Sequence, residues 1–193
     1  MIKKQSKSLV VDASVARAAG DPPNNPRSEI CRDCLVQIRD SKYNICMTPE
    51  IQKEWDDHAS RFSRKWQANM IAKKQFSYQP LSADSSLRKI IEESVLIFHT
   101  DLSDEAIFNI KNSIFKDCCL IEAALVSDKT VVSLDDKTAR IYFSQAAKQI
   151  KEIQEIVWVN PAKNEEKPIE WLMNGAPAET ERFLVNYLPK NTQ

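Results

Sequence analysis

The fold is decided by the stretch Lys7-Ser8-Leu9-Val10-Val11-Asp12-Ala13-Ser14, a short apolar run that stops at a carboxylate. The same pattern returns in Thr130-Val131-Val132-Ser133-Leu134-Asp135. Outward from these two runs, further strands are predicted at residues 43–48 and 156–160, and helices at residues 27–41, 49–62, 85–98, 103–115, 116–126 and 137–149. Short apolar strands that alternate with helices are typical of an α/β protein. We therefore expect a three-layer α/β/α architecture around a central, mostly parallel sheet.

Composition narrows the class of protein. The 193 residues include 27 Lys plus Arg and 27 Asp plus Glu, which gives a formal net charge of +0 and excludes a broadly basic nucleic-acid coat. A hydrophobic fraction of 42% and a mean hydropathy of -0.43 describe an ordinary globular chain. No apolar run approaches the roughly 20 residues of a membrane span, and polar residues follow Met1-Ile2-Lys3-Lys4, unlike a signal peptide. We expect a cytoplasmic protein with no membrane partner.

Two common kinds of ligand site are disfavoured by the sequence. With only two glycines, the chain has no glycine-rich phosphate loop. Cys31 and Cys34 form a CxxC pair, but no second pair of ligands completes a zinc site. Because the pair falls in a predicted helix, we interpret both cysteines as small buried side chains. The use of five cysteines without a secretion signal suits a reducing compartment.

Several carboxylates stand where chemistry is expected. In parallel sheets, ligands bind beyond the carboxyl ends of the strands, where Asp12 and Asp135 lie. Asp117 shares the apolar stripe of its predicted helix, and an inward carboxylate is costly without a compensating partner. A position at a helix N-terminus would also explain it. Glu54 flanks the stripe of the helix that begins at Thr48-Pro49, and Asp12, Asp135 and Asp136 could instead cap turns.

Such a group of carboxylates suits a hard cation. Oxygen ligands without histidine or cysteine favour Mg²⁺ or Mn²⁺. Cations of this kind activate water and stabilise displacement at phosphorus. The residues alone therefore indicate metal-dependent phosphodiester chemistry.

The same residues resemble a known family, the PIN domains. Val10-Val11-Asp12-Ala13-Ser14 resembles their opening strand, and Thr48-Pro49-Glu50-Ile51-Gln52-Lys53-Glu54-Trp55 resembles their "P-x-V-x-x-E" helix. Lys116-Asp117-Cys118-Cys119-Leu120-Ile121-Glu122-Ala123-Ala124 is similar to the "D-x-x-L-x-x-A-A" helix, and Val132-Ser133-Leu134-Asp135-Asp136 to the "(T/S)-x-D" strand end. The four motifs follow the family's order from about Leu9 to Asn160. The resemblance implies a nuclease domain over residues 1–160.

The resemblance also implies an activity and a set of site residues. It implies a Mg²⁺- or Mn²⁺-dependent endoribonuclease, a hydrolase whose metal ligands and catalytic acids are Asp12, Glu54, Asp117 and Asp135. Ser14 and Ser133 would orient these carboxylates from behind, and Asp136 is a weaker candidate. RNA is then the substrate. Bacterial members are often VapC-like toxins of toxin–antitoxin pairs, so an antitoxin is the protein partner that the family suggests.

Two regions outside the motifs bear on binding. Residues 58–83 carry Lys and Arg but no acid, with aromatic residues between them, so Arg61, Arg64 and Lys65 are candidate RNA-binding residues. Phe62 is expected to pack inward. His58, four residues after Glu54, could touch the pocket, but we expect a buried helix histidine instead. Compared with compact members of the family, residues 55–82 form an insertion. Residues 161–193 form a helical extension that we expect to cover the domain, a partner or a second copy in a homodimer.

Two other interpretations of the sequence remain. One is a non-catalytic module with a PIN-like fold that binds RNA or a protein. The other is a receiver-like α/β fold, which needs an acidic pair at the first strand, whereas Val10-Val11-Asp12-Ala13 supplies a single acid. A metal titration separates catalysis from a binding module, because the module need not respond to Mn²⁺.

Overall fold

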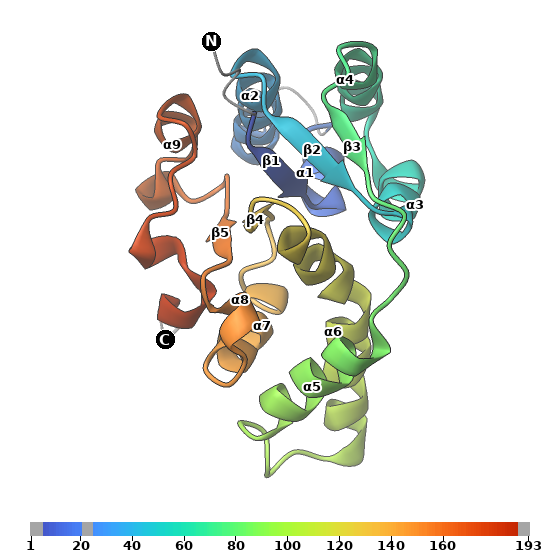
Figure 1. Ribbon diagram of the computed structural model, residues 1–193, viewed down its shortest axis with the longest axis vertical. Helices are drawn as coiled ribbons and strands as arrows, with labels where there is room; N and C mark the ends of the chain where they lie inside the picture. Colours follow the sequence, from blue (N-terminus) through green and yellow to red (C-terminus); the bar gives the residue numbers. More distant parts are fainter. Residues whose placement is uncertain (1–5, 21–24, 189–193) are drawn as a thin grey trace.

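A computed structural model describes residues 6–20 and 25–188, and in them one central sheet (Figure 1). Its strands are β1 (Ser8–Val11), β2 (Asn44–Met47), β3 (Phe76–Tyr78), β4 (Thr130–Val132) and β5 (Val157–Val159). They pair in the order β3-β2-β1-β4-β5, and every pair of neighbours is parallel. The expectation of a mostly parallel sheet in an α/β protein is confirmed. Residues 1–4, in which we expect no signal peptide, lie outside the described residues. Residues 21–24, a short stretch of Asp, Pro and Asn, also lie outside them.

Helices cover both faces of the sheet. One layer contains α5 (Ser85–Leu96), α6 (Asp104–Leu125), α7 (Ala139–Ala147) and α8 (Lys151–Gln154), with α6 packed on β1, β2 and β4. The other contains α1 (Ala13–Ala18), α2 (Pro26–Asp40), α4 (Arg61–Ala72) and α9 (Pro168–Met173), in which α2 contacts the other three. Helix α3 (Pro49–His58) packs on α1 and also contacts α6. The chain winds one way from β1 to β3 and the other way from β4 to β5. Because crossovers between parallel strands are right-handed as a rule, this reversal places the connecting helices on opposite faces of the sheet.

The order of the strands fixes where a site can form. The direction of winding reverses between β1 and β4, which are neighbours in the sheet. The crevice at such a reversal, beyond the carboxyl ends of the strands, is the usual ligand site of a doubly wound sheet. Asp12 follows β1 directly, and Asp135 lies three residues after β4. The backbone N–H of Asp12 donates to the carbonyl of Val132 at 3.0 Å, which ties the two strand ends together.

Local sequence explains most element boundaries. The apolar residues of β1, β2, β4 and β5 are buried, whereas the edge strand β3 is partly exposed. The Thr48 hydroxyl accepts from the backbone N–H of Ile51 at the start of α3, where Pro49 takes the first turn. Helix α2 begins in the same way at Asn25 and Pro26. The two helices predicted for residues 103–115 and 116–126 are one continuous helix, α6. The prediction of a break was wrong because Lys116 offers a polar residue but neither a proline nor a glycine to end the helix.

The secondary structure of residues 55–82 differs from the prediction. The helix predicted to continue through Phe62 ends at His58, and α4 begins after the cap at Ser60. Residues 76–78 then form the edge strand β3, which was not predicted. The short helices α1 and α8 were not predicted either. Phe62 does pack against the core, and Trp66 is buried with its indole N–H donating to the carbonyl of Leu35.

The segment after β5 packs on the rest of the molecule. Trp171, Leu172 and Leu184 are buried in the same core as the strands. The Tyr43 hydroxyl donates to the carbonyl of Leu172 at 2.6 Å, and Phe183 makes an antiparallel bridge to Val157. The part of this segment that the structure describes therefore covers one edge of the sheet.

Two further findings concern the helices and the cysteines. Of the helices in residues 6–20 and 25–188, none has both the length and the apolar character needed to cross a membrane. The five cysteines are buried and none forms a disulfide, which confirms the interpretation of Cys31 and Cys34 as buried side chains.

One close approach between segments gives a stability prediction. A Cβ added at Gly20 would lie 1.9 Å from the Cβ of Ser60, so α1 and the start of α4 cannot keep their separation. We expect Gly20→Ala to lower the free energy of unfolding by about 1–3 kcal/mol, as overpacking does in other cores. Urea denaturation measures this loss. The double variant Gly20→Ala/Ser60→Gly should recover most of the lost free energy of unfolding, because it removes the Ser60 Cβ. A Gly20→Ala variant as stable as the wild-type chain would contradict the packing described.

Candidate functional site

The structure brings the four carboxylates predicted for the site to one pocket. Asp12, Glu54, Asp117 and Asp135 all line a pocket of about 160 Å³ at the carboxyl edge of the sheet. They come from four separate elements: the end of β1, the middle of α3, the interior of α6 and the loop after β4. Asp117 is the fourteenth residue of a 22-residue helix, so the alternative that it caps a helix N-terminus is wrong.

Asp12 is held by two serine hydroxyls. Its Oδ2 accepts a hydrogen bond from the Ser133 hydroxyl at 2.6 Å and another from the Ser14 hydroxyl. Its Oδ1 accepts from the backbone N–H of Ser14 at 3.3 Å, so Asp12 also caps α1, as the sequence allowed. Both serines that were expected behind the acids thus contact the first of them.

Asp135 is joined to the same serines. Its backbone N–H donates to the Ser133 hydroxyl at 3.1 Å, and the N–H of Leu134 donates to the Ser14 hydroxyl at 3.2 Å. Its carboxylate Oδ1 accepts from the backbone N–H of Thr138 at 2.8 Å. Two hydroxyls therefore connect the end of β1 to the loop after β4, and fix two pocket acids relative to one another.

The ionised form of the Asp117 carboxyl is disfavoured in the pocket. Burial raises the pKa of its carboxyl to about 7, and the charges of Asp12, Asp135 and Glu54 add to that rise while Lys116 opposes it. A carboxyl with such a pKa is one whose ionised form is poorly compensated by its surroundings. Groups of this kind gather at functional sites.

Glu54 has a lysine and a histidine as neighbours at the rim of the pocket. The Lys116 Nζ lies 3.8 Å from its Oε2, and the His58 Nε2 lies 3.7 Å from the same atom. His58 is exposed and lines the pocket, so the expectation of a buried helix histidine was wrong. The helix ends at His58, which leaves this side chain beyond the buried stripe of Ile51 and Trp55.

The cations beside the acids are not those that the sequence suggested. Arg17, His58 and Lys116 line the acidic pocket, whereas Arg61, Arg64 and Lys65 line a separate shallow hollow on α4. The Arg64 guanidinium donates to the backbone carbonyls of Ala59 and Asp56, both at 3.1 Å. The guanidinium of Arg17 makes no hydrogen bond or ion pair with any residue that the structure describes. Arg17 lies on α1, and without that helix no pattern in the sequence pointed to it.

The donor set has the chemistry of a hard-cation site but not its closed geometry. Four carboxylates supply the oxygen ligands that Mg²⁺ and Mn²⁺ prefer. Within residues 6–20 and 25–188, no three His, Cys, Asp or Glu side chains are gathered closely enough to hold a metal ion together. Like-charged carboxylates repel one another, which favours separated side chains unless a cation lies between them. Burial is the main cause of the raised pKa of Asp117, and this repulsion adds to it.

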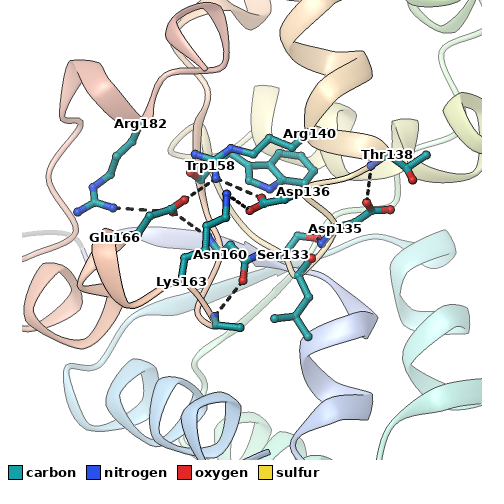
Figure 2. A network of polar contacts seen from close by, with 12 residues as sticks. Ser133, Asp135, Asp136, Thr138, Arg140, Trp158, Asn160, Lys163, Glu166 and Arg182 are labelled. Carbon is teal, nitrogen blue, oxygen red and sulfur yellow. Dashed lines mark hydrogen bonds and ion pairs between the residues drawn. The ribbon is translucent and has the colours of Figure 1, made fainter. Parts of the chain in front are cut away.

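Asp136 belongs to a different cluster. Its carboxylate forms ion pairs with Arg140 at 3.1 Å and with Lys163 at 2.5 Å, and it does not line the acidic pocket. Figure 2 shows the neighbouring carboxylates in different places, Asp136 among these cations and Asp135 beside Thr138. The suggestion that Asp136 only caps a turn was therefore wrong, because its charge is paired with the buried Arg140 and the partly exposed Lys163.

A second buried arginine, Arg88, lies between helices that carry pocket acids. Arg88 on α5 donates to both carboxylate oxygens of Glu122 on α6, each at 2.7 Å, and to Glu50 on α3 at 2.6 Å. Its side chain is 5% exposed and its guanidinium lies over the ring of Phe115. Arg88 thus links the helices that carry Glu54 and Asp117.

Comparison with known proteins returns nothing similar: no family model, no curated protein and no solved structure matches this chain.

Proposed function

We propose that this chain is a metal-dependent endoribonuclease with a PIN-like fold, which hydrolyses phosphodiester bonds of RNA in its acidic pocket. The observation that carries the proposal is the convergence of Asp12, Glu54, Asp117 and Asp135 on one pocket at the winding reversal of a parallel sheet. Burial and the neighbouring acids raise the pKa of Asp117 to about 7, so a positive charge in the pocket would stabilise the ionised form of this carboxyl. A divalent cation supplies such a charge.

The four carboxylates would hold Mg²⁺ or Mn²⁺. When bound, such an ion supplies an activated water and stabilises the charge that develops on the phosphate. Ser133 and Ser14 keep Asp12 in place through their hydroxyls. The backbone N–H of Thr138 holds one oxygen of Asp135 and leaves the other available to the pocket.

The cations at the rim suit a polyanionic substrate. Arg17 and Lys116 line the pocket together with the acids, and the Arg17 guanidinium is unpaired among the described residues. Positive side chains at this place offset the repulsion between carboxylates and a phosphodiester backbone. RNA as the substrate, and an antitoxin as a protein partner, follow from the resemblance to PIN domains. A cytoplasmic location is part of the same proposal, supported by five cysteines that form no disulfide.

Cleavage of a long unstructured RNA in Mn²⁺ tests the function. We expect cutting by the wild-type chain that EDTA abolishes and that Asp12→Asn or Asp135→Asn reduces at least about 100-fold, because removing one transition-state-stabilising group commonly costs that much. Asp33→Asn, at an exposed acid on α2 that does not line the pocket, is the matched control and should cut normally.

The opposite result is equally informative. Absence of cutting by the wild-type chain, or equal cutting by all variants, would overturn the nuclease and favour a binding module. RNA binding in EDTA, measured by a gel-shift titration, would then identify that module.

A further inference from the structure

The loop after β4 is anchored on both sides of Asp135 by the segment that follows β5. The carbonyl of Leu134 accepts from the side-chain amide of Asn160 at 3.3 Å. On the other side, the carboxylate of Asp136 lies 2.5 Å from the Nζ of Lys163. A pocket acid is therefore flanked in the chain by two residues tied to a segment that does not line the pocket.

Arg140 is the centre of this connection. Its Nη1 donates to Asp136 at 3.1 Å and to Glu166 at 2.6 Å, and its Nη2 donates to the carbonyl of Trp158 at 2.8 Å. Its side chain is 3% exposed, and the ring of Tyr187 covers the guanidinium at 4.1 Å. Glu166 also accepts from the backbone N–H of Asn160 at 3.0 Å (Figure 2). Charge-assisted bonds in a buried place hold a geometry strongly.

Arg140 acts on Asp135 through the backbone as well. The N–H of Arg140 donates to the carbonyl of Asp135 at 3.1 Å, and the N–H of Thr138 donates to the Asp135 carboxylate. The start of α7 thus holds both the main chain and the side chain of the pocket acid. A displacement of the Arg140 side chain moves the same short turn that orients Asp135.

We propose that Asp136, Arg140 and Glu166 form a clasp that positions Asp135 in the acidic pocket, so that the segment after β5 completes the site without touching it. This inference rests on the proposed nuclease function. The three residues are positioning residues, since none of them lines the acidic pocket. Partners that orient a metal-binding side chain typically change metal affinity or activity by about 10–100-fold when they are replaced.

The test compares two isosteric changes in the full chain. Asp136→Asn removes the charge that pairs with Arg140 and Lys163. Glu170→Gln removes a partner of Lys167 in the same segment, at an exposed pair that makes no contact with Asp136, Arg140 or Glu166. Mn²⁺ affinity is measured from the free-ion electron paramagnetic resonance signal, at a temperature where circular dichroism shows all proteins folded. We expect Asp136→Asn to bind Mn²⁺ about 10-fold more weakly, with Glu170→Gln within twofold of wild type.

Steady-state kinetics supply a second readout. A displaced Asp135 should lower kcat about 10-fold and leave the KM for RNA within twofold, with the full number of Mn²⁺ sites still present. A partly unfolded protein would instead lose Mn²⁺ sites in the same proportion as activity. If Asp136→Asn does not fold, Glu166→Gln decides the matter, because it weakens the same connection from the other side.

The outcomes separate the two proposals. Mn²⁺ binding and kcat unchanged in a folded Asp136→Asn or Glu166→Gln variant would overturn the clasp and leave the nuclease standing. A wild-type chain that neither binds Mn²⁺ nor cuts RNA would overturn the nuclease, and the clasp with it.

Discussion

Asp117→Asn is expected to abolish RNA cleavage and to stabilise the protein at the same time. Cleavage should fall at least about 100-fold, because the variant removes one of the four carboxylates from the pocket. The free energy of unfolding in EDTA at pH 8 should rise, because the wild-type carboxylate is buried and repelled by Asp12, Asp135 and Glu54. Activity and stability that change in opposite directions are typical of a site held in place by the rest of the fold.

The same residue predicts a pH dependence. Burial and neighbouring acids raise the pKa of Asp117 from 3.8 to about 7, so the folded chain binds a proton here that the unfolded chain releases between these values. Stability contributed by this group is therefore fully present below about pH 4 and is lost as the pH rises towards 7. Above pH 7 only the penalty of the buried charge remains.

Urea denaturation between pH 4 and pH 8 in EDTA measures both effects. The difference in unfolding free energy between Asp117→Asn and the wild-type chain should grow with pH, while Asp33→Asn on α2 shows no such growth. Addition of Mn²⁺ at pH 8 should stabilise the wild-type chain more than the Asp117→Asn variant. A difference that is constant with pH would show that Asp117 is not buried among charges as described.

Arg88→Met should cause the largest loss of stability that we expect from a single substitution. The change leaves Glu122 without the guanidinium that contacts both its oxygens, and this carboxylate is 8% exposed. Removal of one partner of a buried ion pair typically costs about 3–5 kcal/mol, because the remaining charge is stranded. Glu50, the other partner, is 44% exposed and is solvated when Arg88 is absent.

Two further variants isolate the cause. Arg88→Met/Glu122→Gln removes the stranded charge and should recover a large part of the loss. Lys89→Met changes the neighbouring cation, whose contact with Glu93 is exposed on both sides, and should cost less than about 1 kcal/mol. Denaturation curves that place Arg88→Met within the range of Lys89→Met would contradict the importance of this buried pair.

Much of the fold follows from short-range patterns. The apolar runs before Asp12 and Asp135 are strands, and their parallel pairing was expected from the helices between them. The cap and proline at Thr48-Pro49 mark the start of α3 as predicted. Asp117 was notable because a carboxylate interrupted an apolar stripe, and the structure places it on the pocket. Each of these signals lies within a few residues of the feature it predicts.

What the sequence did not predict depends on contacts between distant residues. Arg140 is separated from Glu166 by 26 positions and Arg88 from Glu122 by 34, so no local spacing connects them. The cations of the pocket were missed for the same reason. Arg61, Arg64 and Lys65 were conspicuous as a run without acids, whereas Arg17 stands alone in the sequence and meets the acids only after folding.

The position of the clasp in the chain has a consequence for synthesis. All four acids are translated before Asn160, whereas Glu166 and Tyr187, which hold Arg140, are translated after it. A nascent chain therefore presents every carboxylate of the pocket before the loop with Asp135 can be locked. We expect such a chain on the ribosome to cut RNA about 10-fold more slowly than the folded protein until Glu166 and Tyr187 have emerged, because the loop with Asp135 is not held in place before then.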